Sequence, residues 1–257
     1  MNEKKFNDKA EAYVAARPSY PAEFINMLFD VSGGIGMSQS STVVDVGSGT
    51  GKFAELLLDR GAKVFAVEPN DDMRAAAEKR LSAHRLFVSV RGSAENTTLA
   101  DKSADFVTAA QAFHWFDAAA FRNECLRILK PGDKALLVWN AFDDTDKNCC
   151  AYGEILRAHC PLFRGFGGGY ADNPGAIQLF FDGAYQTATY TSVQSYDRQG
   201  LINRALSASY TPRPSDDGYA AFIDTLSAFF DARRHEGKIN FSNRTNAYYG
   251  ALYEKAA

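Results

Sequence analysis

Three glycines at alternate positions, Gly47, Gly49 and Gly51, are the residues whose spacing points most directly to chemistry. Glycine backbone can turn sharply and can approach a bound ligand closely, because no Cβ atom stands in the way. The acidic Asp45 precedes the first glycine, and the valine-rich segment 42–46 has the β-branched composition of a strand that is buried on both faces. We therefore expect a buried strand that ends in a ligand-binding turn and continues into a helix.

Two other kinds of glycine-rich loop must be compared with this spacing. The P-loop of nucleoside triphosphatases is excluded, because Val46 occupies its first glycine position and Phe53 occupies its Ser/Thr position. The dinucleotide fingerprint G-x-G-x-x-G/A is met from Gly49 to Ala54, although this register leaves Asp45 without a role. A nicotinamide-dependent oxidoreductase therefore remains an alternative.

A second acidic residue, Glu68, follows the next predicted strand, residues 63–67. In open α/β sheets ligands bind at the carboxyl ends of the strands, and an acid about twenty residues after the glycine turn can hydrogen-bond to ribose hydroxyls. Glu68 thus favours a ligand that contains a ribose, which is found in several classes of cofactor.

The elements that would position these residues alternate between strand and helix patterns. Strands are predicted at residues 42–46, 63–67, 86–90, 105–110 and 134–139, with helices at 52–60, 70–83 and 117–129 between them. This alternation indicates βαβ units and a mostly parallel sheet. Residues 186–197 and 238–249 also have strand patterns, so we expect a seven-stranded sheet in one α/β domain. Between these last two strands, Ser215 is predicted to cap a helix.

Composition and charge exclude several classes of protein. The chain has 257 residues and a net charge of −3, so no basic field indicates a nucleic-acid partner. It contains no run of about eighteen apolar residues and no apolar segment near its start, so neither a membrane span nor a signal peptide is predicted. The four cysteines, Cys125, Cys149, Cys150 and Cys160, lack the paired spacing of a zinc site. We expect a cytoplasmic protein without a bound metal, and the oligomeric state stays open.

Five segments resemble the class I S-adenosylmethionine-dependent methyltransferases. Residues 45–51 resemble motif I of that family, and residues 93–95 resemble the segment beside its adenine. Residues 111–117 are similar to the A-x-x-x-H-W-F-D signature of the methyltransferase type 11 subfamily, which includes trans-aconitate-methyltransferase-like proteins. Residues 126–132 resemble the helix end before the fifth strand, and residues 6–21 resemble the subfamily's opening segment. The resemblance covers nearly the whole chain and is weakest at residues 141–185.

The resemblance implies a Rossmann-like sheet with an antiparallel last strand, and S-adenosylmethionine as cofactor with S-adenosylhomocysteine as product. It also implies one domain, 1–257, in which residues 1–41 form N-terminal cap helices, 42–140 form the cofactor-binding core, and 141–257 form a substrate roof and the last two strands. The acceptor would be a small molecule, and small polycarboxylates are the candidates that the resemblance suggests. A non-catalytic cofactor-binding protein on the same fold is a second alternative.

The residues expected to contact the cofactor come from the N-terminal segment, the glycine turn and the strand ends. They are Tyr13, Arg17, Asp45, Gly47, Ser48, Gly49, Gly51, Glu68, Pro69, Met73, Ala94, Glu95, Gln111, Phe113 and Trp115. A guanidinium fits a carboxylate bidentately, so Arg17 is expected to pair with the carboxylate of the cofactor. His114 is the candidate catalytic residue, either as a general base or as an orienting hydrogen-bond donor. A histidine that only packs its ring is the alternative for this position.

Overall fold

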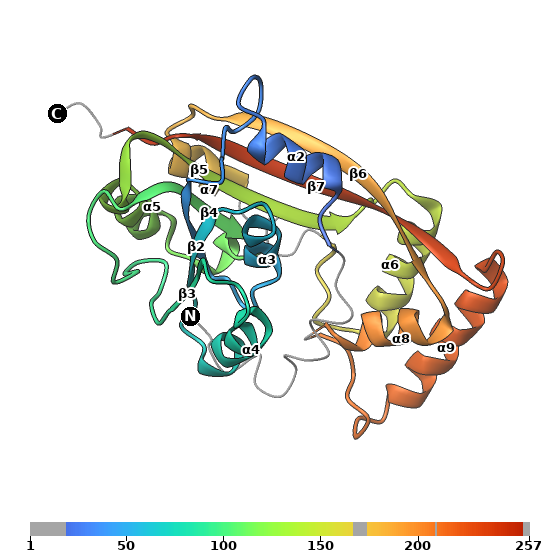
Figure 1. Cartoon of the computed structure of the whole chain (residues 1–257). Coiled ribbons are helices and arrows are strands. Elements are labelled where there is room, and N and C mark those ends of the chain that lie inside the picture. The colour runs from blue at the N-terminus through green and yellow to red at the C-terminus, as the bar shows by residue number, and fades with distance from the viewer. Residues whose placement is uncertain (1–18, 167–173, 209, 254–257) are drawn as a thin grey trace.

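The computed structural model describes residues 19–166, 174–208 and 210–253 and is built on one seven-stranded sheet (Figure 1). The strand order is β3-β2-β1-β4-β5-β7-β6, and β7 is antiparallel to both of its neighbours. This arrangement confirms the predicted Rossmann-like α/β sheet with an antiparallel last strand.

The strands and helices have the following bounds. The strands are β1 (Thr42–Val46), β2 (Lys63–Val67), β3 (Phe87–Val90), β4 (Ala104–Ala110), β5 (Leu129–Phe142), β6 (Gln186–Tyr196) and β7 (Ile239–Ala251). The helices are α2 (Ala22–Phe29), α3 (Lys52–Leu58), α4 (Asp71–Leu81), the 3-10 helix η2 (Phe113–Trp115), α5 (Ala118–Ile128), α6 (Lys147–His159), α7 (Pro174–Phe181), α8 (Arg198–Leu206) and α9 (Tyr219–Arg233).

Helices cover both faces of the sheet, as the valine-rich strands require. Successive side chains of a strand point to opposite faces. Val44 packs in the apolar cluster that includes residues of α5 and α7, whereas Val43 packs in the cluster that includes residues of α2 and α3. Side-chain caps fix two of the helix starts, because the side chain of Asn70 accepts from Met73 N–H at α4 and that of Asp117 caps α5.

A third apolar cluster lies beyond the end of the parallel strands, where α6, α8 and α9 form a lobe (Figure 1). The last residue of β4, Ala110, pairs with Val138, but β5 continues with β7 as far as the pair Phe142 and Asn243. The long antiparallel pair therefore projects past the parallel sheet and carries the lobe. Phe241 is fully buried at its centre.

Two α-helices and the 3-10 helix η2 were not predicted, and one predicted helix start is wrong. The apolar helix α7 has no polar face in its sequence and packs its Phe180 against Phe121 of α5. The other missed α-helix is α8. Helix α9 begins after Gly218 and not at Ser215, because a turn precedes it in which the N–H of Tyr219 donates to the carbonyl of Asp216.

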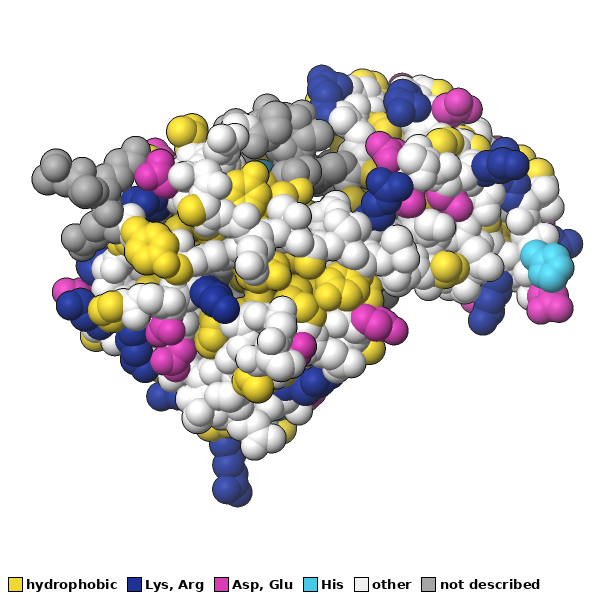
Figure 2. All heavy atoms as spheres, turned by 90° about the horizontal axis from the view of Figure 1, so that it is seen from above, with side chains coloured by type: hydrophobic (Ala, Val, Ile, Leu, Met, Phe, Trp, Pro, Cys, Tyr) yellow, Lys and Arg dark blue, Asp and Glu magenta, His cyan; other side chains and the backbone are white. Residues whose placement is uncertain are grey.

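The surface carries charges of both signs. Seen from above in Figure 2, Lys and Arg side chains are interspersed with Asp and Glu side chains, including on the right-hand lobe of α6, α8 and α9. Among the described residues no helix is long and apolar enough to cross a membrane.

The substitution Phe241→Ala tests the packing of the lobe. The ring of Phe241 lies 5.1 Å from that of Phe142 and 5.6 Å from that of Tyr152, measured between centroids. Removing it leaves a cavity, so we expect the free energy of unfolding to fall by about 3–5 kcal/mol in urea denaturation. The control Val31→Ala changes a side chain that is 80% exposed, and it should shift the free energy of unfolding by less than about 0.5 kcal/mol. Equal effects of the two substitutions would contradict the assignment of Phe241 to the core.

Candidate functional site

The turn after β1 adopts the conformation that its glycines predict. Gly47, Gly49 and Gly51 have φ angles of 67°, 57° and 77°, in the left-handed region that favours glycine. A Cβ atom on Gly47 would lie 2.7 Å from Cβ of Ala112, and one on Gly51 would lie 2.6 Å from Cδ1 of Leu81. A Cβ on Gly49 would meet no described atom within 4 Å. The protein itself packs against the first and third glycines, and the space beside Gly49 is open to a ligand.

Asp45 is completely buried in β1, immediately before this turn. Its Oδ1 accepts a hydrogen bond from the Thr108 hydroxyl at 2.8 Å, and no group of the described residues donates to its Oδ2. Burial raises the pKa of the Asp45 carboxyl to about 7, the Thr108 hydroxyl opposes this rise, and the charge of Glu68 adds to it. A donor or cation that reached Oδ2 would stabilise the ionised form.

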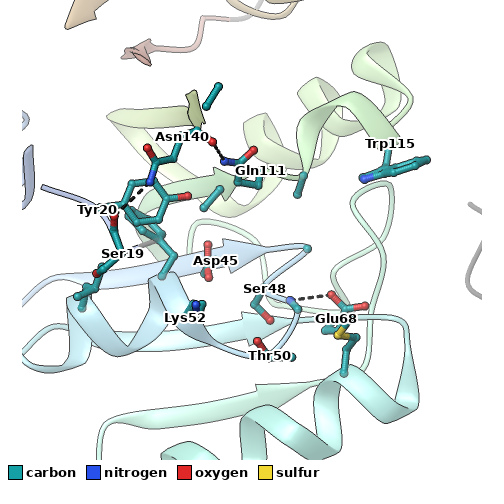
Figure 3. A pocket seen from close by; sticks show the side chains of 18 of the residues that line it. Ser19, Tyr20, Asp45, Ser48, Thr50, Lys52, Glu68, Gln111, Trp115 and Asn140 are labelled. Carbon is teal, nitrogen blue, oxygen red and sulfur yellow. Dashed lines mark hydrogen bonds between the residues drawn. The ribbon is translucent and has the colours of Figure 1, made fainter. Parts of the chain in front are cut away.

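Glu68 lies at the end of β2 with its carboxylate turned toward the glycine turn (Figure 3). Gly49 N–H donates to its Oε2 and Asn70 N–H donates to its Oε1, each at 2.9 Å. These two backbone bonds fix the plane of the carboxylate beside the open face of Gly49, where it can meet a ligand.

A cavity of about 330 Å³ lies against these residues and extends toward the lobe. The predicted site residues that line it are Asp45, Gly47, Ser48, Gly49, Glu68, Pro69, Met73, Ala94, Gln111 and Trp115. Its volume lies within the range typical of small-molecule sites, about 300–1,000 Å³. The carboxyl ends of β1, β2 and β4 therefore bring most of the predicted residues to one place.

Other predicted residues lie outside this lining. Gly51 packs against α4, and the carboxylate of Glu95 accepts a hydrogen bond from Asp117 N–H ahead of α5. Phe113 is buried in the apolar core, with its ring 5.2 Å from that of Phe180. Tyr13 and Arg17 fall outside the described residues.

His114 also lies outside the cavity lining. Its Nδ1 accepts a long hydrogen bond of 3.4 Å from Nε1–H of Trp139, and its ring packs 4.9 Å from that of Trp115. The half-buried imidazole thus has the packing contacts of the alternative named above. Its role in proton transfer stays a prediction.

Gln111 connects the part of the cavity beside the glycine turn to β5. It ends β4 with a φ of 58°, a conformation that is unusual for a residue other than glycine. Its backbone N–H donates to Val138 and its Nε2 donates to the carbonyl of Asn140 at 2.5 Å (Figure 3). These bonds hold the strained residue in place, which is common at functional sites.

The part of the cavity that faces the lobe, which we call the lobe end, contains none of the residues predicted to bind the cofactor or to act in catalysis, although residues 141–257 were expected to form a substrate roof. Its lining residues are Asn140, Ala141, Phe142, Gly165, Phe166, Arg204, Tyr210 and Asn243. They come from β5, the segment after α6, α8 and the segment after it, and β7. No local pattern joins these segments, because only the pairing of β5 with β7 and the packing of the lobe bring them together.

The substitution Asp45→Asn tests the burial of this carboxyl by its pH dependence. The native pKa of about 7 is higher than the ordinary value of about 4 expected in the unfolded chain, so between these values the native state binds more protons. The stability that the raised pKa of Asp45 gives the native state is complete below about pH 4 and is lost as the pH rises to about 7. The free energy of unfolding of the wild type, minus that of Asp45→Asn, should therefore fall by roughly 1.4 kcal/mol per pH unit in this window. Urea denaturation at several pH values measures it, and a difference that rises or stays flat contradicts it.

The chain was compared with known proteins. Residues 44–137 match the family described as a methyltransferase domain, Methyltransf_11. The chain is 38% identical over 151 residues to "Uncharacterized methyltransferase Rv3342" of Mycobacterium tuberculosis, and the match spans 59% of this chain and 58% of that protein. It is 26% identical over 246 residues, 92% of both chains, to "Uncharacterized methyltransferase C25B8.09" of Schizosaccharomyces pombe.

A solved structure has the same fold. Phosphoethanolamine N-methyltransferase 2 of Haemonchus contortus, in complex with S-adenosyl-L-methionine, superposes with a TM-score of 0.55 at 14% identity and covers 99% of this chain and 60% of that one. At this identity the likeness concerns the fold. Residues 44–137 thus match a methyltransferase domain family, and the chain is similar to relatives that are described as methyltransferases.

Proposed function

We propose that this protein transfers a methyl group from S-adenosylmethionine to a carboxylate of a small-molecule acceptor. The observation that carries the proposal is that a single cavity joins the glycine turn and Glu68 to the lobe end. A donor and an acceptor can thus lie in one cavity, with the reacting atoms held at near contact.

The residues at the glycine turn suit the cofactor chemically. Buried polar atoms in proteins are nearly always hydrogen-bonded, yet Asp45 Oδ2 and Ser48 Oγ have no partner among the described residues. We assign Glu68 to the ribose hydroxyls, and Ser48 with Asp45 to the amino-acid end of the cofactor. Pro69, Met73 and Ala94 would form apolar walls for the adenine.

The lobe end suits an acceptor group that does not have to lose a proton before it takes up the methyl group. When bound, S-adenosylmethionine supplies a methyl group activated by a positively charged sulfur, and a carboxylate can accept it without a general base. No histidine occurs among the described residues that line the cavity. Trp115 and Phe116 present rings to the same cavity, and ring faces attract cations. The residues of this chain would therefore act mainly by positioning and by excluding water.

The choice of cofactor is testable by thermal unfolding. A ligand that binds the native state raises its stability, by about 2.7 kcal/mol at a concentration of 100 times Kd. We expect S-adenosylmethionine and S-adenosylhomocysteine to raise the melting temperature and NAD to leave it unchanged. A rise with NAD alone would favour the oxidoreductase alternative. Cofactor binding without methyl transfer to any acceptor in a fractionated metabolite extract would favour a non-catalytic binding protein.

The substitution Glu68→Gln tests the assignment of the ribose. The amide keeps the shape of the side chain but loses the charged acceptor, so affinity for S-adenosylhomocysteine should fall by about 1.5–3 kcal/mol in isothermal titration. The control Glu78→Gln changes a carboxylate of α4 that is 51% exposed and lies outside the cavity lining, and it should leave the affinity unchanged. An equal affinity of Glu68→Gln and the wild type would remove Glu68 from the cofactor site.

A further inference from the structure

The lobe end combines aromatic rings with one guanidinium. Phe142, Phe166 and Tyr210 line it together with Arg204, which comes from α8. The guanidinium carbon of Arg204 lies 5.1 Å from the centre of the Phe142 ring. The charge is thus placed against an apolar surface and away from the two carboxylates of the glycine-turn end.

Within the described part of the chain, the charge of Arg204 has no acidic partner. Among the described residues no carboxylate forms an ion pair with it, and its Nε is buried without a hydrogen-bond acceptor. The hydroxyl of Tyr196 is a neutral group near Arg204: burial raises its pKa and the charge of Arg204 opposes that rise. A charged group that is partly removed from water without an opposite charge is costly, so the site favours an anionic ligand.

Two other arginines show how the fold treats such groups elsewhere. Arg198, on the same helix, stacks on the ring of Phe230 at 5.3 Å but forms an ion pair with Asp231. Arg80, which also lines the cavity, forms an ion pair with Glu55. Arg204 differs from both because none of the described acidic residues forms an ion pair with it.

The amides at this end are occupied by the protein. Asn140 donates to the carbonyl of Ser19 and accepts from the hydroxyl of Thr245. Asn243 donates from its Nδ2 to the carbonyl of Phe241 at 3.4 Å. These side chains are held in fixed orientations by the protein, so the strongest attraction for an acceptor comes from Arg204.

We propose that Arg204 binds a single carboxylate of the acceptor and that the rings of Phe142, Phe166 and Tyr210 enclose a flat apolar body. The acceptor class would be an aromatic or unsaturated monocarboxylate, and not the polycarboxylates that the family resemblance suggests. One guanidinium can hold one carboxylate bidentately, and each oxygen keeps a lone pair. One oxygen can then form the bond to the methyl carbon while the bond from that carbon to sulfur breaks and neutral S-adenosylhomocysteine leaves. A second carboxylate would lie against aromatic rings and lose its hydration without compensation. The inference rests on the proposed function, since it assigns the acceptor of that reaction.

The test uses full-length protein saturated with S-adenosylhomocysteine and titrated with cinnamate, cinnamamide and citrate in a calorimeter. Cinnamate should bind, and its neutral amide and the tricarboxylate should each bind at least tenfold more weakly. Arg204→Gln should lose at least tenfold in cinnamate affinity while its affinity for S-adenosylhomocysteine stays within twofold of the wild type. Arg204→Lys keeps the charge without the planar fork, so its affinity for cinnamate should lie between those of Arg204→Gln and the wild type. Arg198→Gln is the matched control on the same helix and should bind cinnamate as the wild type does.

Several results would overturn the inference. They are equal binding of cinnamate and cinnamamide, tighter binding of citrate, no binding of cinnamate by the loaded wild type, or an equal loss in Arg198→Gln and Arg204→Gln. Each of these leaves the proposed function standing if S-adenosylhomocysteine binds. Failure of the wild type to bind S-adenosylhomocysteine would instead refute the proposed function itself. If Arg204→Gln does not give a cooperative melting transition, the comparison of Arg204→Lys with the wild type decides the inference.

Discussion

The site depends on how closely the turn after β1 approaches the turn after β4. A single added methyl group on Gly47 would lie 2.7 Å from Cβ of Ala112, so only glycine fits there. This contact draws Gln111 and the 3-10 helix behind it toward the glycine turn. Gly47 N–H and Ser48 N–H both donate to the carbonyl of Val67, and these bonds hold the end of β2 and the following Glu68 beside the glycine turn. The cavity lies where these strand ends meet.

The two ends of the cavity differ in their charged groups, since acids and bases both line the glycine-turn end and Arg204 lies at the lobe end. Buried carboxylates lie at the glycine turn, where burial raises the pKa of Asp45 to about 7. A guanidinium without an acidic partner among the described residues lies at the lobe end. A cationic donor and an anionic acceptor would each meet their complement, and this separation would set their order along the cavity. The protein can orient two substrates in this way without a proton-transfer group between them.

The sequence predicts the half of the site that is encoded in local patterns. Valine-rich strands and the glycine spacing depend on short local patterns, and Glu68 is recognised by its place after the next strand, about twenty residues after the glycine turn; the structure has all three where they were expected. The lobe end could not be predicted in this way. The strand pair that joins residues 134–142 to 243–251 brings Phe142 and Asn243 together, and the packing of α8 in the lobe adds Arg204. His114 shows a related limit, since a motif can specify a residue type without deciding between chemistry and packing.

The position of β7 has a consequence for the order of assembly. This strand lies between β5 and β6, although it follows both in the chain. Before β7 is in place, β5 has an open edge and β6 has no strand of this sheet to pair with, so neither the long antiparallel pair nor the lobe that it carries can be completed. Contacts between segments so distant in sequence form slowly, and unpaired strand edges invite association between chains. The nascent chain must therefore keep the edge of β5 protected until its last strand is available.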